Sequence, residues 1–227
     1  VVVSGISYLS YLLKRYVFHE SGTLVSGIIG GLYSSTATIS VLARKSRKAS
    51  EQEATEYVAA MLLAVSMMFL RFMILILIFS REIFLSIYPY LLIMSVVSAI
   101  VGWFVHSRQK LPKDTSVESE EDDSSNPLEF KVALIFAVLF VVFTVLTHYT
   151  LVYAGTSGLN LLSFVSGFSD ITPFILNLLQ NTGSVAVLII TACSMQAIVS
   201  NILVNMFYAL FFAGKRSKLR PWILGGF

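Results

Sequence analysis

The sequence has little charge, one cysteine and few histidines. Charged residues make up only 13% of the chain, about half the share of an average soluble domain. The single cysteine, Cys193, excludes an internal disulfide and a cysteine-rich metal site. The three histidines, His19, His106 and His148, lack the spacing of metal ligands. No Ser-His-Asp order, phosphate loop or HExxH motif is present, so we expect neither an enzyme nor a cofactor.

Apolar residues are abundant instead. They make up 56% of the chain, and the mean hydropathy is +0.79. Crossing a bilayer takes about 20 mostly apolar residues, and such runs recur along the whole sequence. The net charge of +3 comes from short connecting segments, where basic residues usually report membrane orientation. The expected partner is therefore a lipid bilayer and not nucleic acid.

Seven apolar segments follow one another along the chain. Strands of a membrane β-barrel would be about half as long and would alternate in polarity, so the segments predict helices. The expected fold is an all-α integral membrane protein, a polytopic helical bundle of seven to eight spans. The chain begins at Val1, and Trp222–Phe227 read like the first turn of an eighth span, so we expect a piece of a longer protein. The segments are approximately 1–18, 22–43, 56–80, 86–106, 129–153, 157–180 and 184–213.

The two halves of the chain share a pattern. An acidic, serine-rich linker at 108–128 separates a first repeat of four spans, 1–107, from a second repeat, 129–227, of three spans plus the start of an eighth. A shift of 136 positions places Gly31 on Gly167 and Thr36 on Thr172. It also aligns the stretches "GIIGGLYSSTAT" and "SFVSGFSDITPF", each of which interrupts an apolar segment. The sequence therefore predicts an internal repeat with two interrupted helices.

Basic residues do not orient this seven-span arrangement. If every segment crosses the membrane, the lysines and arginines of the connecting segments divide eight against seven. Such an even split gives no preferred side. Either one segment is re-entrant or the two halves are inverted relative to each other, and the sequence leaves both open.

Two charged residues lie inside apolar segments, and they are the first candidates for function. An ionised group at mid-bilayer costs several kcal/mol and normally faces the protein interior or a wet cavity. Asp170 is followed by Pro173 and preceded by Gly167, which predicts a break in the sixth segment. We expect Asp170 to be an ion or proton site and the candidate metal ligand. Arg71 either neutralises Asp170 or binds an anionic group.

Polar side chains near these positions complete the candidate site. Asn177 lies two turns beyond Asp170 on the same helix face, and Asn201 belongs to a polar face of the seventh segment. Hydroxyl oxygens suit cations such as Mg²⁺, and the second segment offers them after Gly30 and Gly31. They belong to Ser34, Ser35, Thr36 and Thr38.

A packing interpretation stands beside the functional one. Gly27, Gly31 and Ser35 are spaced four apart, and small residues at that spacing allow membrane helices to approach closely. Serine and threonine hydroxyls in such helices also bond the carbonyl one turn back. Such faces would also suit a homodimer.

Several motifs resemble a known family. They are "VSGISYLSYLLKRY", "GIIGGLYSSTATISVLARKS", "FLRF", "NPLEFKVALIF" and "SFVSGFSDITPF". The chain resembles an uncharacterised prokaryotic membrane domain usually found C-terminal to an MgtC/SapB-type domain. This resemblance implies a multi-pass protein of the prokaryotic cytoplasmic membrane, an MgtC/SapB-type domain as partner, and ion homeostasis by association. The family's second motif often carries two acidic positions, whereas here only Asp170 is acidic and Thr172 takes the second place.

Two functions from different classes follow. The preferred one is a transporter or channel for a small ion, with a divalent cation such as Mg²⁺ as one candidate. The alternative is a membrane regulator that transports nothing and binds a partner protein through its small-residue helix faces. A lipid-directed enzyme is a third reading, supported only by Arg71.

Overall fold

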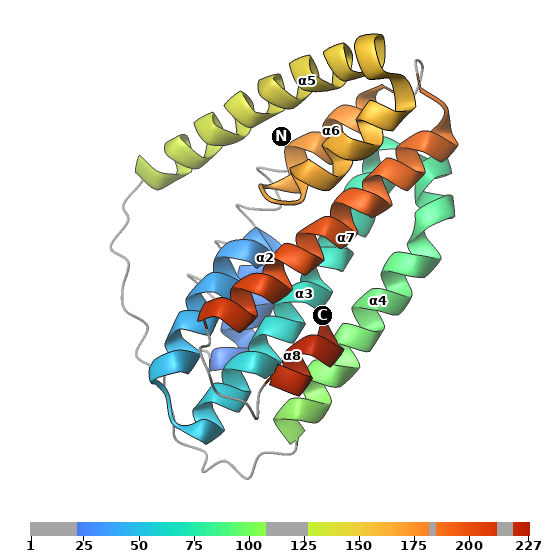
Figure 1. The fold of residues 1–227 in the computed structure, drawn as a ribbon. Coiled ribbons are helices and arrows are strands. Elements are labelled where there is room, and N and C mark those ends of the chain that lie inside the picture. Colours follow the sequence, from blue (N-terminus) through green and yellow to red (C-terminus); the bar gives the residue numbers. More distant parts are fainter. Residues whose placement is uncertain (1–21, 108–126, 182–184, 213–219) are drawn as a thin grey trace. The chain divides into compact units, whose positions relative to one another are not determined.

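The computed structural model describes residues 22–107, 127–181, 185–212 and 220–227 (Figure 1). The first apolar segment and nearly all of the acidic linker lie outside these ranges. Every element within the described ranges is an α-helix. The helices are α2 (Thr23–Lys48), α3 (Glu51–Phe79), α4 (Arg81–Ser107), α5 (Pro127–Ser166), α6 (Ile171–Gln180), α7 (Val187–Phe212) and α8 (Arg220–Gly226).

Five of these helices are long and apolar enough to cross a membrane, judged by length and composition. They are α2, α3, α4, α5 and α7, whereas α6 is shorter. The predicted class, a multi-pass helical membrane protein, is therefore supported. The number of spans and the internal repeat stay predictions.

The chain forms two compact units that share three of the long helices. The first unit contains α2, α3 up to Leu75, α4 from Tyr88, the end of α7 from Asn205, and α8. The second contains the end of α3, the start of α4, α5, α6, and α7 up to Val204. Each unit holds one of the two interrupted segments.

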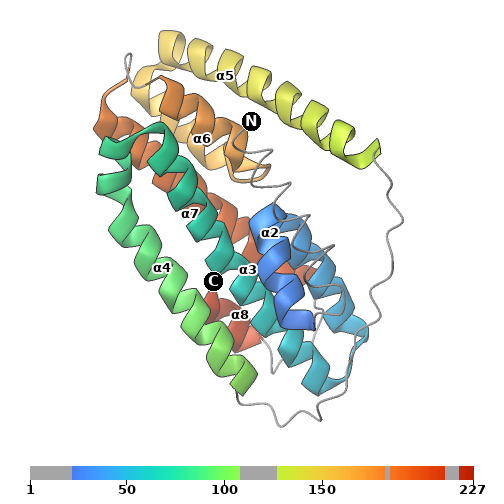
Figure 2. The ribbon, with the colours of Figure 1, turned by 180° about the vertical axis from the view of Figure 1, so that it is seen from behind.

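In the first unit, α2 is two helical arms, 23–33 and 35–48, joined by Ser34 in an extended conformation (φ −155°, ψ 104°). The arms fold back on each other (Figure 2). A straight helix would place residues 30 and 38 about 12 Å apart along its axis, yet a Cβ added to Gly30 would collide with the Thr38 side chain.

The connection to α3 also requires the reversal in α2. Gly27 lies against Ala60 and Gly31 against Ala64, so the first arm runs parallel to α3. If α2 were straight, Lys48 would lie about 25 Å beyond Gly31, while Glu51 lies about 20 Å before Ala64. Residues 49 and 50 cannot bridge that gap, because an extended residue spans at most about 3.6 Å. The interruption predicted in the second segment is therefore a chain reversal.

The second unit contains a similar hairpin. α5 breaks at Gly155 (φ 59°, ψ −148°), a left-handed conformation that glycine adopts without steric cost. Its second arm, 156–166, runs parallel to α7, because Asn160 contacts Cys193 and Phe164 contacts Ser200. The chain then reverses at residues 167–170 and returns as α6, since residues 181–186 are too few to reach Val187 otherwise. The break predicted at Asp170 is thus confirmed.

Candidate functional site

Asp170 is the N-cap of α6, at the tip of the second hairpin. Its backbone is extended (φ −73°, ψ 112°), and its Oδ1 accepts a 2.9 Å hydrogen bond from the Thr172 backbone N–H. The positive end of the helix dipole favours a carboxylate at this position. Pro173 lies in the first turn, where a missing N–H leaves no helical bond unmade. The sequence therefore starts a new helix directly after the carboxylate.

Asp170 is exposed, although the helix that it caps is enclosed. All residues from Ile171 to Leu179 are buried, on every face of α6. The carboxylate, together with Phe168 and Ser169, lies outside this apolar environment. The hairpin thus holds a single charge at its tip, on a short helix fixed by packing all around it.

The backbone of this tip is held by α7. Asn201, which is 3% exposed, donates from Nδ2 to the Gly167 carbonyl at 3.0 Å and the Ser169 carbonyl at 3.4 Å. Ser200 donates to the Phe164 carbonyl at 2.7 Å. Gly167 packs so closely on Ser200 that an added Cβ would collide with it. Asn201, a predicted site residue, thus lies at the tip, and the assignment of a functional role to it stays a prediction, whereas the sequence did not indicate Ser200.

Ser34 forms the tip of the α2 hairpin. Its Oγ accepts a 3.4 Å hydrogen bond from the Ala37 N–H, so that it caps the second arm as Asp170 caps α6. The last carbonyls of a helix have no intrahelical donors, and at the end of the first arm Arg71 of α3 supplies them. Its Nη1 lies 2.7 Å from the Tyr33 carbonyl oxygen and 3.5 Å from that of Leu32. The sequence did not indicate this capping role, and the pairing of Arg71 with Asp170 stays a prediction.

The two tips use residues that stand 136 positions apart. Ser34 and Asp170 are the caps, and the carbonyls just before them, Tyr33 and Ser169, accept bonds from the next long helix. Gly31 packs on Ala64 and Gly167 on Ser200, and these two contacts have the same offset. Ser34 and Asp170 differ in type, so a search for identical residues overlooks the most informative pair.

The remaining hydroxyls of the second segment have local roles. Thr38 packs against Gly30 across the reversal, and Ser35 is buried. The Thr36 carbonyl accepts a 2.8 Å bond from Ser40 Oγ. The burial of Ser35 and the contact of Thr38 favour the packing interpretation for these two hydroxyls, and Ser34 is the hydroxyl at the tip.

Asn177 belongs to a different polar cluster. It lies about 10 Å further along the axis of α6 than Asp170, and it is buried whereas Asp170 is exposed. Its Nδ2 donates to Thr144 Oγ1 at 2.8 Å, and Asn181 Nδ2 donates to its backbone carbonyl at 2.7 Å. These bonds tie the end of α6 to α5. Thr144 and Asn181 carry no charge and occur in no motif, so the sequence did not indicate them.

The small-residue face of α2 is occupied within its own unit. Gly27 and Gly31 lie directly against the backbone of Ala60 and Ala64 in α3. The predicted close helix packing is therefore present, but between α2 and α3. A partner protein would need another surface.

Among the described residues, Asp170, the candidate metal ligand, belongs to no larger cluster of metal-ligating side chains. Across the described part of the chain, no group of three or more His, Cys, Asp or Glu residues could hold a metal ion. A cation at Asp170 would have this carboxylate as a ligand, with other oxygen atoms completing the shell. That ligand set suits hard cations better than metals that prefer thiolate or imidazole.

Comparison with known proteins gives a family without an activity. A protein of Aquifex aeolicus (strain VF5), described as "Uncharacterized protein", is 26% identical over 205 residues, covering 89% of this chain and 87% of the relative. No solved structure matches the chain. The family described as "Domain of unknown function (DUF4010)" matches residues 1–213, and the chain belongs to this family.

Proposed function

We propose that this protein moves a small ion across the membrane, as a transporter or channel, and that Asp170 is its ion or proton site. The observation that carries the proposal is the exposed carboxylate at the tip of a hairpin whose helix α6 is otherwise buried. An ionised group in an apolar segment is costly and normally lies on an ion or substrate pathway. Many transporters build such sites from interrupted helices, where helix ends and unpaired backbone groups meet the ion.

The chemistry of the tip restricts the ion. One carboxylate with neutral oxygens provides a single negative charge, which favours a monovalent cation, a proton, or a divalent cation such as Mg²⁺ that keeps part of its water shell. The Ser34 tip offers hydroxyl and carbonyl oxygens but no carboxylate, and Arg71 adds positive charge beside it. Of the two tips, the one at Asp170 is therefore the better cation site.

An internal repeat and a bacterial location complete the proposal. The four residue pairs that build the two tips support a duplicated unit, because each pair has the same offset and the same role. The relative from Aquifex aeolicus is bacterial, which supports a multi-pass protein of a prokaryotic cytoplasmic membrane. An MgtC/SapB-type domain remains a candidate partner on the basis of resemblance alone, and a homodimer rests on the small-residue pattern alone, part of which packs on α3.

Ion flux into liposomes that contain the purified protein tests this function. Asp170→Asn is the informative variant, because asparagine caps a helix about as well as aspartate while it removes the charge. Flux of one ion among Mg²⁺, Ca²⁺, Mn²⁺, Na⁺, K⁺ and H⁺ is expected, and the variant should lower it at least about tenfold, the factor that 1.4 kcal/mol represents.

Glu82→Gln is the matched control. Glu82 is an exposed carboxylate in the first turn of α4, and its removal should leave flux unchanged. Equal flux in wild type and Asp170→Asn would refute the role of the carboxylate. No flux of any ion from folded protein would favour the regulator that transports nothing.

A further inference from the structure

The arms of both hairpins are too short to cross a bilayer. At 1.5 Å per residue, 23–33 and 35–48 are about 16 and 21 Å long. In the second hairpin, 156–166 and the ten residues of α6 are about 16 and 15 Å long. The hydrocarbon core is about 30 Å thick. Each hairpin can therefore enter the membrane and reach its middle, but it must leave on the side from which it entered.

Side chains at the two tips agree with this depth. Irregular backbone at mid-membrane is tolerated only where protein or water satisfies its polar groups. Asn201 and Arg71, from the neighbouring long helices, donate to the tip carbonyls. Asn201 lies 11 residues before the end of α7 at Phe212, and Arg71 lies 8 residues before the end of α3 at Phe79, about 16 and 12 Å along the helix axes. Both donors are thus about two turns or more inside helices that are long enough to span.

The order of the helices along the chain then determines on which side of the membrane each connection lies. The two ends of the α2 hairpin, near residues 22 and 48, are called its feet, and both lie on one side of the membrane. α3 then crosses to the other side, and α4 crosses back. The first arm of α5, 127–154, crosses again, so that both feet of the second hairpin lie opposite the feet of the first. α7 returns to the starting side.

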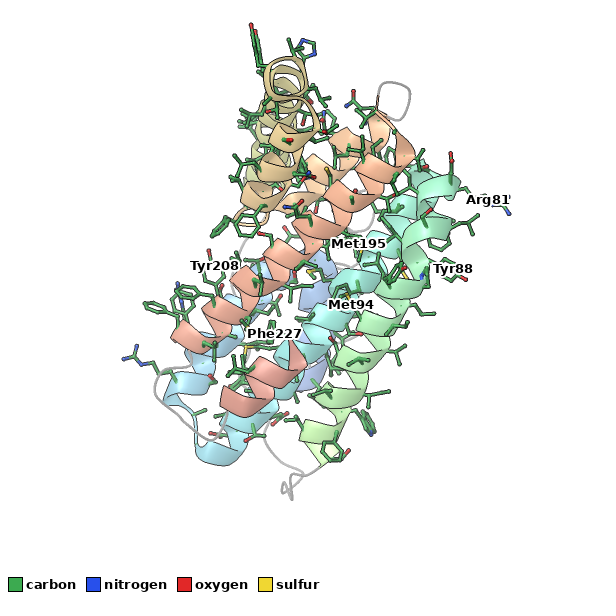
Figure 3. All side chains as sticks on the ribbon, turned by 45° about the vertical axis from the view of Figure 1, so that its right-hand side comes forward. Arg81, Tyr88, Met94, Met195, Tyr208 and Phe227 are labelled. Carbon is green, nitrogen blue, oxygen red and sulfur yellow. The ribbon has the colours of Figure 1, made fainter. Side chains whose placement is uncertain are left out.

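Basic residues divide sharply under this arrangement. The starting side receives the end of α2, the stretch from the end of α4 to Lys131 in the second turn of α5, and the segment after α7, with four lysines or arginines in each. Among the basic residues in the connecting segments from α2 onward, only Arg81 falls on the other side, and it is exposed at the start of α4 (Figure 3). Such an asymmetry identifies the starting side as cytoplasmic. The twelve residues are Arg44, Lys45, Arg47, Lys48, Arg108, Lys110, Lys113, Lys131, Lys215, Arg216, Lys218 and Arg220.

We propose that the chain carries two re-entrant hairpins that enter the membrane from opposite sides. The hairpin of α2, with Ser34 at its tip, opens to the cytoplasm, and the hairpin of 156–180, with Asp170 at its tip, opens to the outside. The even split obtained from seven crossings arises because two segments were counted as spans. This topology does not rest on the proposed function, since it would hold for a protein that transports nothing.

Sided labelling of single cysteines tests the topology. Cys193 is replaced by serine, and one cysteine is placed at Thr156, Gln180, Gly22 or Arg47, all of which are exposed. A thiol reagent that cannot cross the membrane is applied to intact bacteria and to permeabilised ones. Thr156→Cys and Gln180→Cys should be labelled in intact cells. Gly22→Cys and Arg47→Cys should be labelled in permeabilised cells and not in intact ones.

Each pair of feet is its own comparison, because a spanning segment would place the two members on opposite sides. Labelling of Thr156→Cys and Gln180→Cys from different sides would overturn the outer hairpin, and the same result for Gly22→Cys and Arg47→Cys would overturn the inner one. Glu82→Cys and Ser107→Cys report the outer and inner ends of α4. Leu188→Cys, 78% exposed at the start of α7, replaces Gln180→Cys if that variant does not accumulate.

Discussion

Replacing Gly31 or Gly167 by leucine is expected to destabilise the protein by about 3 kcal/mol or more, at the upper end of the range for overpacking. A Cβ at Gly31 would collide with the backbone of Ala64, and one at Gly167 with Ser200 and the backbone of Asn201. Backbone in a packed helix cannot move aside as a flexible side chain can. The midpoint of denaturation in detergent, compared with wild type, measures the loss.

Gly22→Leu is the matched control for both substitutions. No atom lies within 4 Å of a Cβ added at Gly22, which precedes the first arm of α2. Because Gly22 is the N-cap of α2, where glycine is preferred to leucine, its replacement should cost about 1 kcal/mol and no more. If Gly31→Leu or Gly167→Leu were as stable as Gly22→Leu, the close contacts that hold the hairpins to α3 and α7 would be wrong.

Replacing Arg71 by methionine is expected to loosen the α2 tip. The guanidinium donates to the Tyr33 carbonyl at 2.7 Å, and its loss leaves a carbonyl without this donor at a cost of about 1–3 kcal/mol. Methionine also removes a charge, and an arginine costs about 2.5–3.5 kcal/mol on membrane-insertion scales. The substitution therefore favours membrane insertion while it weakens the tip. Global stability therefore mixes two effects of opposite sign, and a local measurement is needed.

Hydrogen exchange of the backbone amides in 32–38 provides that local measurement. Exchange there should rise about tenfold or more in Arg71→Met, which corresponds to 1.4 kcal/mol of local opening. The exchange rate in Arg71→Lys should lie between those of wild type and Arg71→Met, because lysine keeps the charge but lacks the planar guanidinium group. Unchanged exchange at the tip, with or without a change elsewhere, would show that Arg71 does not hold it.

Much of the fold was predictable from local chemistry. Pro173 and Gly167 indicated the break before α6, because proline cannot donate a helical bond and glycine tolerates tight backbone approach. The glycines of "GIIGGLYSSTAT" indicated the other interruption. The reversal of direction was not predictable from either stretch, since it depends on which residues of α3 and α7 the arms contact. Hydropathy measures length along the chain, and a folded-back hairpin has the same hydropathy as a single span.

Residues of the candidate site were predictable where placing them in an apolar segment costs much free energy, and less so where it costs little. Asp170 and Arg71 were visible as charges in apolar segments. Asn201 was visible as an amide on a helix face. Ser200 and Thr144 make specific bonds to the hairpin arms, but serine and threonine are common in membrane helices and carry no such signal. The role of Arg71 as a cap for α2 needed the structure, because the carbonyl that it contacts is 38 residues away in sequence.

The measurement that tests the central claim most directly is the infrared difference spectrum of the purified protein on addition of its ion. Direct coordination should shift the carboxylate stretching bands, and proton binding should replace them with the band of a protonated acid. We predict that this change is present in wild type and in Glu82→Gln and absent in Asp170→Asn. An identical difference spectrum in Asp170→Asn would show that another group binds the ion, and it would contradict the assignment of Asp170 as the ion or proton site.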